Sequence, residues 1–179
     1  MMNDMVKQET IAARGQALRA GIFDGPQDDH QYLTFMLGAE IFAINILNIK
    51  EIIEYGDLTL VPKMPGFIRG VINLRGAVVP VIDLAARFDK GEAAISRKSC
   101  IVIIEVLQET GHQVIGVLVD AVNEVLEIAA DQIEPVPSFG AKISTDFIDG
   151  MGKVDQKFVI LLNVNQILSS SEMAALVLN

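Results

Sequence analysis

The stretch GVINLRGAVVPVIDL, residues 70–84, decides the fold. It holds two runs of β-branched and other apolar residues, which are typical of β-strands. Arg75 and Gly76 separate the two runs, and glycine is common in tight turns. The stretch therefore predicts a β-hairpin with Arg75 at its tip. Because Pro80 has no amide hydrogen, we expect its strand to lie at a sheet edge or at a bulge.

The residues before this hairpin predict further strands. Residues 32–37 and 41–44 are strand-like runs, and residues 38–40 between them indicate a turn. Residues 46–53 fit a helix or a strand by periodicity alone. Their β-branched content favours a strand, with room for one helical turn before it.

The second half of the chain repeats this order. Residues 100–106 and 114–119 match the first two strands. The other matched segments follow in the same sequence: 49–53 with 122–126, 67–70 with 147–150, and 78–84 with 158–164. Asn163 thereby falls opposite Asp83. An internal repeat of this extent predicts duplication of one supersecondary unit.

The predicted fold class is all-β: two pseudo-repeated five-stranded SH3-like β-barrels side by side, with short helices including one at the C-terminus. We expect a polar, flexible leader over residues 1–30, a domain over 31–168 and a terminal helix over 169–179. The domain divides into a first barrel, 31–97, and a second, 98–168. This prediction includes the alternative that the end strands of the two barrels are exchanged. The expected core positions are Phe35, Ile44, Val79, Val81, Ile103, Val117, Val119 and Ile160.

The composition excludes several classes of protein. A formal net charge of −9 argues against nucleic-acid binding, which needs a cationic surface. The longest charge-free run, residues 158–171, is shorter than the roughly 18 apolar residues of a membrane-spanning helix, so no direct membrane insertion is expected. The single cysteine, Cys100, precedes an apolar run, which indicates a small core residue in a reducing compartment such as the cytoplasm.

Motifs for catalysis, metal binding or cofactor binding do not stand out. Neither His30 nor His112 has a second ligand at metal-binding spacing. Only Asp83 and Asp120, each at the end of an apolar run, support the rival interpretation of a small β-barrel hydrolase. Arg75 at a hairpin tip fits either a solubilising residue or a binding hot spot. We therefore expect no catalytic residue, no metal and no cofactor.

The segment 73–76, Asn-Leu-Arg-Gly, followed by the apolar run to Asp83 and Leu84, resembles the CheW family of chemotaxis coupling proteins. The likeness extends over residues 31–178. It implies a non-enzymatic scaffold in signal transduction, without a cofactor. The implied partners are the regulatory domain of the histidine kinase CheA and the cytoplasmic tip of methyl-accepting chemotaxis receptors. The implied location is the cytoplasm, with recruitment to membrane-attached chemoreceptor arrays.

The resemblance also assigns site residues. Carried over by motif, Arg75, Ile49 and Val125 are expected to bind the receptor. Glu51 and Ile52 are expected to couple to the kinase. A coupling protein of another chemosensory pathway, controlling surface motility or second-messenger output, fits the same residues. The leader is longer than the family needs, so its role stays open.

Overall fold

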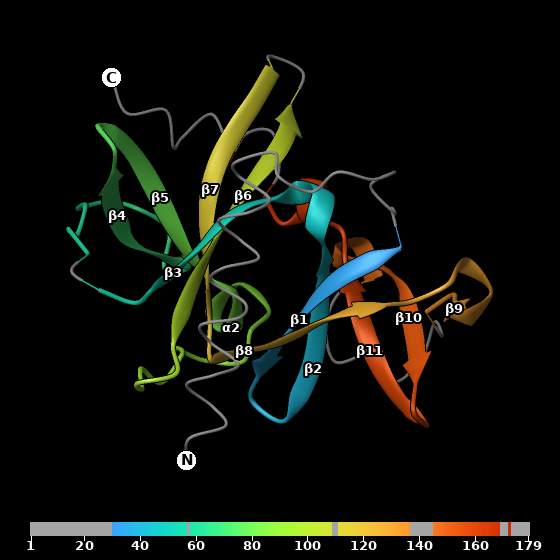
Figure 1. Cartoon of the computed structure of the whole chain (residues 1–179). Helices are drawn as coiled ribbons and strands as arrows, with labels where there is room; N and C mark the ends of the chain where they lie inside the picture. The colour runs from blue at the N-terminus through green and yellow to red at the C-terminus, as the bar shows by residue number, and fades with distance from the viewer. Residues whose placement is uncertain (1–29, 57, 109–110, 137–144, 169–171, 173–179) are drawn as a thin grey trace.

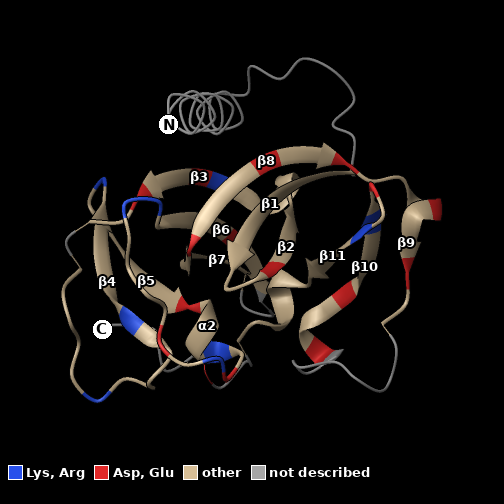
Figure 2. Ribbon diagram, turned by 90° about the horizontal axis from the view of Figure 1, so that it is seen from below, with Lys and Arg blue, Asp and Glu red and all other residues tan. Residues whose placement is uncertain are grey.

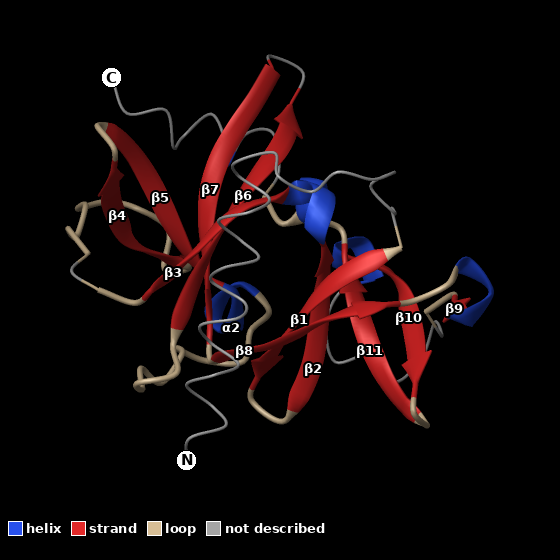
Figure 3. Cartoon of the chain, in the orientation of Figure 1, coloured by secondary structure: helices blue, strands red, loops and turns tan. Residues whose placement is uncertain are grey.

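The computed structural model describes residues 30–56, 58–108, 111–136, 145–168 and 172. These residues form mostly strands, with short helical turns between them (Figure 3). The elements in chain order are β1 (Gln31–Leu37), β2 (Glu40–Asn45), η1 (Ile46–Asn48), β3 (Ile49–Glu54), β4 (Ile68–Leu74), β5 (Ala77–Asp83), α2 (Leu84–Arg87), β6 (Cys100–Gln108), β7 (Gly111–Val119), β8 (Ala121–Glu127), η2 (Ala130–Gln132), β9 (Ile133–Glu134), η3 (Thr145–Phe147), β10 (Ile148–Val154), β11 (Lys157–Leu162) and η4 (Val164–Gln166).

Two of the predicted segments fall almost wholly outside the described residues. They are the leader, of which only His30 is described, and the terminal helix, of which only Glu172 is described. Within the described part of the chain, no helix combines the length and the apolar character that crossing a bilayer requires.

The strands form two sheets (Figure 1). Sheet A has the order β8-β1-β2-β11-β10-β9, and sheet B has the order β3-β6-β7-β5-β4. Helices occupy only short connections, so the all-β prediction is confirmed. The strand predicted for residues 46–53 also forms, as β3, and the 3-10 turn η1 precedes it.

The two sheets show the internal repeat directly. β1 lies between β8 and β2, and β6 lies between β3 and β7 in the same relation. A parallel pairing then follows in each sheet, β11 with β2 and β5 with β7. The first strands of the two halves therefore occupy equivalent places, as the repeat predicts.

Register irregularities recur at repeat-equivalent positions. The β4–β5 pairing shifts between Ile68 and Gly70, and the β10–β11 pairing shifts between Ile148 and Gly150. These two shifts fall in the matched segments 67–70 and 147–150. A second pair of shifts, in β3–β6 and in β1–β8, falls in the matched segments 49–53 and 122–126. Since bulges bend a strand, the two sheets acquire their curvature at matching points.

The predicted boundary at residue 97 does not separate the two sheets. β3, β4 and β5 of the first half pair with β6 and β7, whereas β1 and β2 pair with β8 and β11 of the second half. Thus neither residues 31–97 nor residues 98–168 form a sheet alone. The reason lies at η1, where the Asn45 side chain accepts a hydrogen bond from the Leu47 amide at 2.9 Å. This capped turn directs the chain out of sheet A.

Of the two places expected for Pro80, the sheet edge is wrong, whereas a bulge does lie next to it, where the β4–β5 register shifts opposite Val81 and Ile82. Its strand, β5, lies between β7 and β4 and is not an edge strand. The parallel pairing with β7 starts only at Val81, and on the other side Pro80 faces Val71 of β4. Val71 directs its amide and carbonyl to Thr59 instead. Pro80 therefore occupies a position at which neither neighbouring strand needs a hydrogen bond from its backbone nitrogen.

The predicted core positions are buried, except that Ile160 is half-buried and packs against the core. α2 joins the two sheets at this core. The Phe88 ring lies 5.8 Å from the Phe42 ring of sheet A and 5.3 Å from the Phe147 ring. The Arg87 guanidinium lies 4.8 Å from the Phe67 ring and 4.9 Å from the Phe147 ring. Since Phe67 and Phe147 are repeat equivalents, each half of the chain contributes one of the two rings that contact the Arg87 guanidinium.

Exposed anions gather on sheet A (Figure 2). Glu124 and Glu127 of β8, Asp131 of η2 and Glu134 of β9 are all exposed. All four belong to the second half of the sequence, where residues 91–179 hold five cations and twelve anions.

We expect Gly70→Ala to destabilise the fold by about 2 kcal/mol or more. Gly70 has a φ of +156°, and an added Cβ would lie 2.7 Å from the Thr59 carbonyl oxygen. The matched control is Gly66→Ala, where nothing lies within 4 Å of the added carbon. Urea unfolding should show a lower midpoint for Gly70→Ala only. Equal midpoints for the two variants would contradict the predicted clash.

Candidate functional site

The β4–β5 turn holds Arg75 in an uncommon backbone conformation. Arg75 and Gly76 have φ values of 53° and 87°. Two positive φ values define a type I′ turn, whose twist matches that of the flanking strands. The Asn73 side chain accepts a hydrogen bond from the Gly76 amide at 2.9 Å. Asp155 and Gln156 in the β10–β11 turn also have positive φ values, 49° and 65°, so this conformation is a feature of the hairpin turn in both halves.

The Arg75 side chain reaches across to β3. Its two terminal nitrogens donate to the two carboxylate oxygens of Glu51, at 2.9 and 2.8 Å. The Arg75 side chain is 57% exposed, whereas that of Glu51 is 14% exposed. Such a two-pronged pair fixes the guanidinium plane. Arg75 is therefore accessible to a partner and held in one orientation.

This ion pair borders an apolar groove of about 450 Å³ in sheet B. The groove is lined by residues of β3, the β4–β5 hairpin, β6 and β7, namely Ile49, Lys50, Glu51, Leu74, Arg75, Ala77, Val79, Ile103 and Val114. Ile49 itself is only 7% exposed. An apolar floor with a few oriented polar groups at its rim is the usual composition of a binding site.

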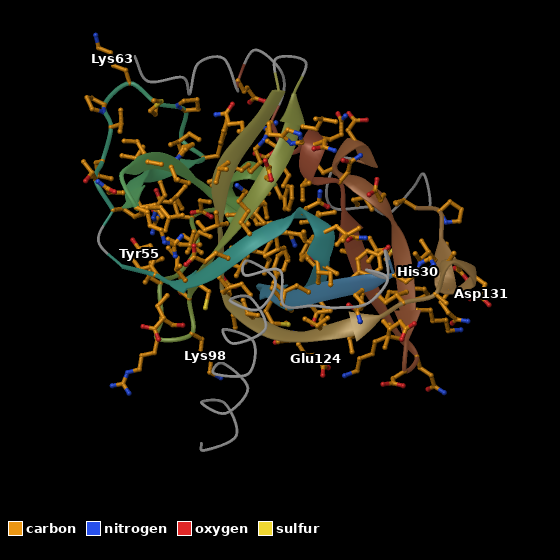
Figure 4. The ribbon with its side chains drawn as sticks, turned by 45° about the horizontal axis from the view of Figure 1, so that its top comes forward. His30, Tyr55, Lys63, Lys98, Glu124 and Asp131 are labelled. Carbon is orange, nitrogen blue, oxygen red and sulfur yellow. The ribbon has the colours of Figure 1, made fainter. Side chains whose placement is uncertain are left out.

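The structure thus brings together three of the five predicted site residues, Arg75, Glu51 and Ile49. Val125 lies instead on β8 of sheet A, paired with Leu33. Its neighbour Glu124 points outward from β8 (Figure 4). Ile52 lies on β3 and pairs with Val102. Val125 and Ile52 are repeat equivalents, and both are half-buried and packed against the core.

The two carboxylates considered for catalysis both hold the backbone. Asp83 is 1% exposed and accepts hydrogen bonds from the Ala86 and Ala93 amides at 3.2 and 2.9 Å. Asp120 accepts a hydrogen bond from the Gly38 amide at 2.7 Å. These contacts give each carboxylate a structural task. The hydrolase interpretation loses the residues that supported it.

Cys100 and the histidines offer no reactive centre among the described residues. Burial raises the pKa of the Cys100 thiol, and the nearby charge of Glu54 raises it further. A thiol with a raised pKa is a poor nucleophile near neutral pH. The described residues include no group of three or more His, Cys, Asp or Glu side chains placed to hold a metal ion.

Sequence reasoning missed the pairing of Arg75 with Glu51 and most of the groove lining. Leu74, Ala77 and Val114 gave no separate signal, because each belongs to an apolar strand pattern. The turn itself carried a signal, since two strand-like runs joined by two residues predict a type I′ turn. Its left-handed backbone was therefore implicit in the sequence.

Comparison with known proteins places this architecture in a family. The model of the CheW-like domain matches residues 31–172. Chemotaxis protein CheW of Klebsiella aerogenes is 36% identical over 144 residues, which are 80% of this chain and 84% of that protein. Protein FrzA of Myxococcus xanthus is 30% identical over 149 residues, 82% of this chain and 90% of that protein. The crystal structure of the scaffolding protein TtCheW from Thermoanaerobacter tengcongensis is similar with a TM-score of 0.73 and 35% identity, covering 84% of this chain and 94% of that one. The chain therefore belongs to the CheW family.

Proposed function

We propose that this protein is a non-enzymatic scaffold that couples methyl-accepting chemotaxis receptors to the histidine kinase CheA. Related proteins carry the names chemotaxis protein CheW and scaffolding protein. The protein works by binding the receptor tip and the kinase regulatory domain at the same time. It acts in the cytoplasm, at receptor arrays attached to the membrane.

One observation carries this proposal: an exposed arginine, oriented by a carboxylate, beside an apolar groove. An amphipathic helix can lay its apolar face into such a groove. The exposed side of the Arg75 guanidinium can bind polar groups at the edge of that helix, and arginine is enriched at interface hot spots. Glu51 serves the same site, because it positions Arg75 through the two-pronged pair.

Co-elution tests the proposal directly. The full chain is mixed with the regulatory domain of a CheA and with a recombinant receptor-tip fragment from the same genome. Size-exclusion chromatography should show a ternary complex, and each binary complex when one partner is left out. A protein that binds neither partner would overturn the proposed function.

We expect Arg75→Ala to weaken receptor-tip binding about thirtyfold, which corresponds to about 2 kcal/mol. Unfolding stability should change by less than about 1 kcal/mol, because the ion pair is largely exposed on the Arg75 side. Arg75→Lys should restore binding only in part, since lysine has no planar fork. Isothermal titration calorimetry with the receptor-tip fragment measures these differences.

The control variant is Arg97→Ala, which removes an exposed cation outside the groove lining. It should bind like the unchanged protein. If Arg75→Ala binds normally, or if it melts at a much lower temperature, Arg75 is structural and the assignment is wrong.

A further inference from the structure

The β6–β7 hairpin is longer than its counterpart in the other half. β6 and β7 have nine residues each, whereas β1 has seven and β2 has six. β3 accompanies β6 only as far as Ile104, and β5 accompanies β7 only from Gly116 onward. Residues 105–108 and 111–115 therefore project past the rest of sheet B (Figure 1). We call this projection the β6–β7 arm.

The arm continues the floor of the groove. Ile103 pairs with Gly116, Glu105 with Val114, and Leu107 with His112, in an unbroken register. Directly opposed residues of an antiparallel pair share one face, and so do residues two apart on a strand. Ile103 and Val114 line the groove, so Leu107 lies on the groove face as well. Leu107 is 60% exposed.

Contacts on two sides hold the arm in place. The Leu107 amide donates to the Asn165 side chain at 2.9 Å, which ties the arm to η4. The Glu105 carboxylate lies 3.8 Å from the Lys50 ammonium of β3 and 3.5 Å from the His112 ring. Lys50 also lines the groove. The arm is thus anchored beside the groove, with an exposed apolar residue at its far end.

We infer that the β6–β7 arm lengthens the receptor-binding groove and that Leu107 contacts an apolar residue of the docked helix. This inference rests on the proposed function. Two residue pairs of the arm beyond the groove lining lengthen the hairpin by about 7 Å, since each residue of a strand adds roughly 3.3 Å. One turn of α-helix rises about 5.4 Å. The arm therefore offers room for about one more helical turn, whose apolar side chain covers Leu107.

The internal repeat supplies the variant that tests this inference. In the trimmed protein, residues 107–112 are replaced by Gly-Ala, the pair that joins β1 to β2 at Gly38 and Ala39. Val106 and Gln113 then flank the turn as Leu37 and Glu40 do in the first hairpin. A second variant, Leu107→Ser, keeps the arm and removes only the apolar side chain.

The probe is the same receptor-tip fragment, titrated against the full-length protein. Removing a leucine side chain that is buried on binding should weaken the complex about tenfold or more, and trimming should weaken it at least as much. Binding to the kinase regulatory domain should not change in either variant. The matched control is Phe158→Ser, since Phe158 is also exposed, at 52%, but lies on β11 and outside the groove lining. That control should bind the receptor tip normally.

The outcomes separate this inference from the proposed function. If Leu107→Ser and the trimmed protein bind the receptor tip normally while Arg75→Ala does not, the arm has no part in docking and only the present inference is wrong. If the unchanged protein binds no receptor tip at all, the proposed function fails and this inference fails with it. Circular dichroism decides whether a weakened variant is folded, and an unfolded trimmed protein leaves Leu107→Ser as the deciding measurement.

Discussion

Asp83→Ala should lower the free energy of unfolding by about 3 kcal/mol. Asp83 is 1% exposed, and one carboxylate oxygen lies 3.5 Å from an Arg69 nitrogen. The same carboxylate accepts hydrogen bonds from the Ala86 amide, which caps α2, and from the Ala93 amide. Its removal leaves these two amides without their acceptor, whereas the Arg69 guanidinium keeps the Ala93 carbonyl oxygen at 3.4 Å and the Glu92 carboxylate at 3.7 Å. Because the Arg69 side chain is 24% exposed, water recovers part of that loss.

The repeat provides a control for this prediction. Asn163 is the repeat equivalent of Asp83, and its side chain accepts a hydrogen bond from the Asn165 amide at 3.1 Å. Position 149, the equivalent of Arg69, is an aspartate, so no cation faces Asn163 from there. Asn163→Ala should therefore cost only about 1 kcal/mol, the usual loss for a cap. Guanidinium unfolding of both variants measures the difference, and equal losses would contradict a special role for the Asp83–Arg69 pair.

These two positions show how far sequence reasoning reached for the fold. The alignment of the two halves predicted that Asp83 and Asn163 are equivalent, and both do begin a helical turn after a strand. The same pattern allowed the two halves to exchange their ends, but it did not say which strands are exchanged. The sequence of β3 is compatible with pairing to either β1 or β6. The geometry of the short turn η1 decides between them, and a sequence repeat carries no information on that geometry.

The individual residues of the candidate site were predictable, but the contacts between them were not. Arg75, Glu51 and Ile49 were each expected at a binding surface through the resemblance, with Glu51 assigned to a different partner from Arg75. Glu51 lies on β3 and Arg75 follows β4, and these strands are the opposite edges of sheet B. No hydrogen-bond ladder joins the two strands, so no register argument could pair residues 24 positions apart. The ion pair itself shows that these two edges approach each other, which the sequence repeat does not predict.

Val125→Asp should weaken receptor-tip binding about tenfold to a hundredfold and leave binding to the kinase regulatory domain nearly unchanged. Val125 is half-buried on β8, and burying a valine in an interface contributes about 1.5–3 kcal/mol. The aspartate also places a charge where an apolar helix face would dock. The proposed coupling requires the receptor and the kinase to be bound at the same time, so the proposal predicts two separable surfaces.

Ile52→Asp is the matched variant, because Ile52 of β3 is the repeat equivalent of Val125 and is half-buried in the same way. It should weaken binding to the kinase regulatory domain by a similar factor and spare the receptor tip. Calorimetric titration of each folded variant against each partner gives four affinities. Reciprocal losses support two separable surfaces, one that includes Val125 and one that includes Ile52. If a folded Val125→Asp protein lost both partners equally, the two surfaces would be one. If it lost neither, Val125 would be a packing residue, and the receptor would bind through the Arg75 groove without contacting β8.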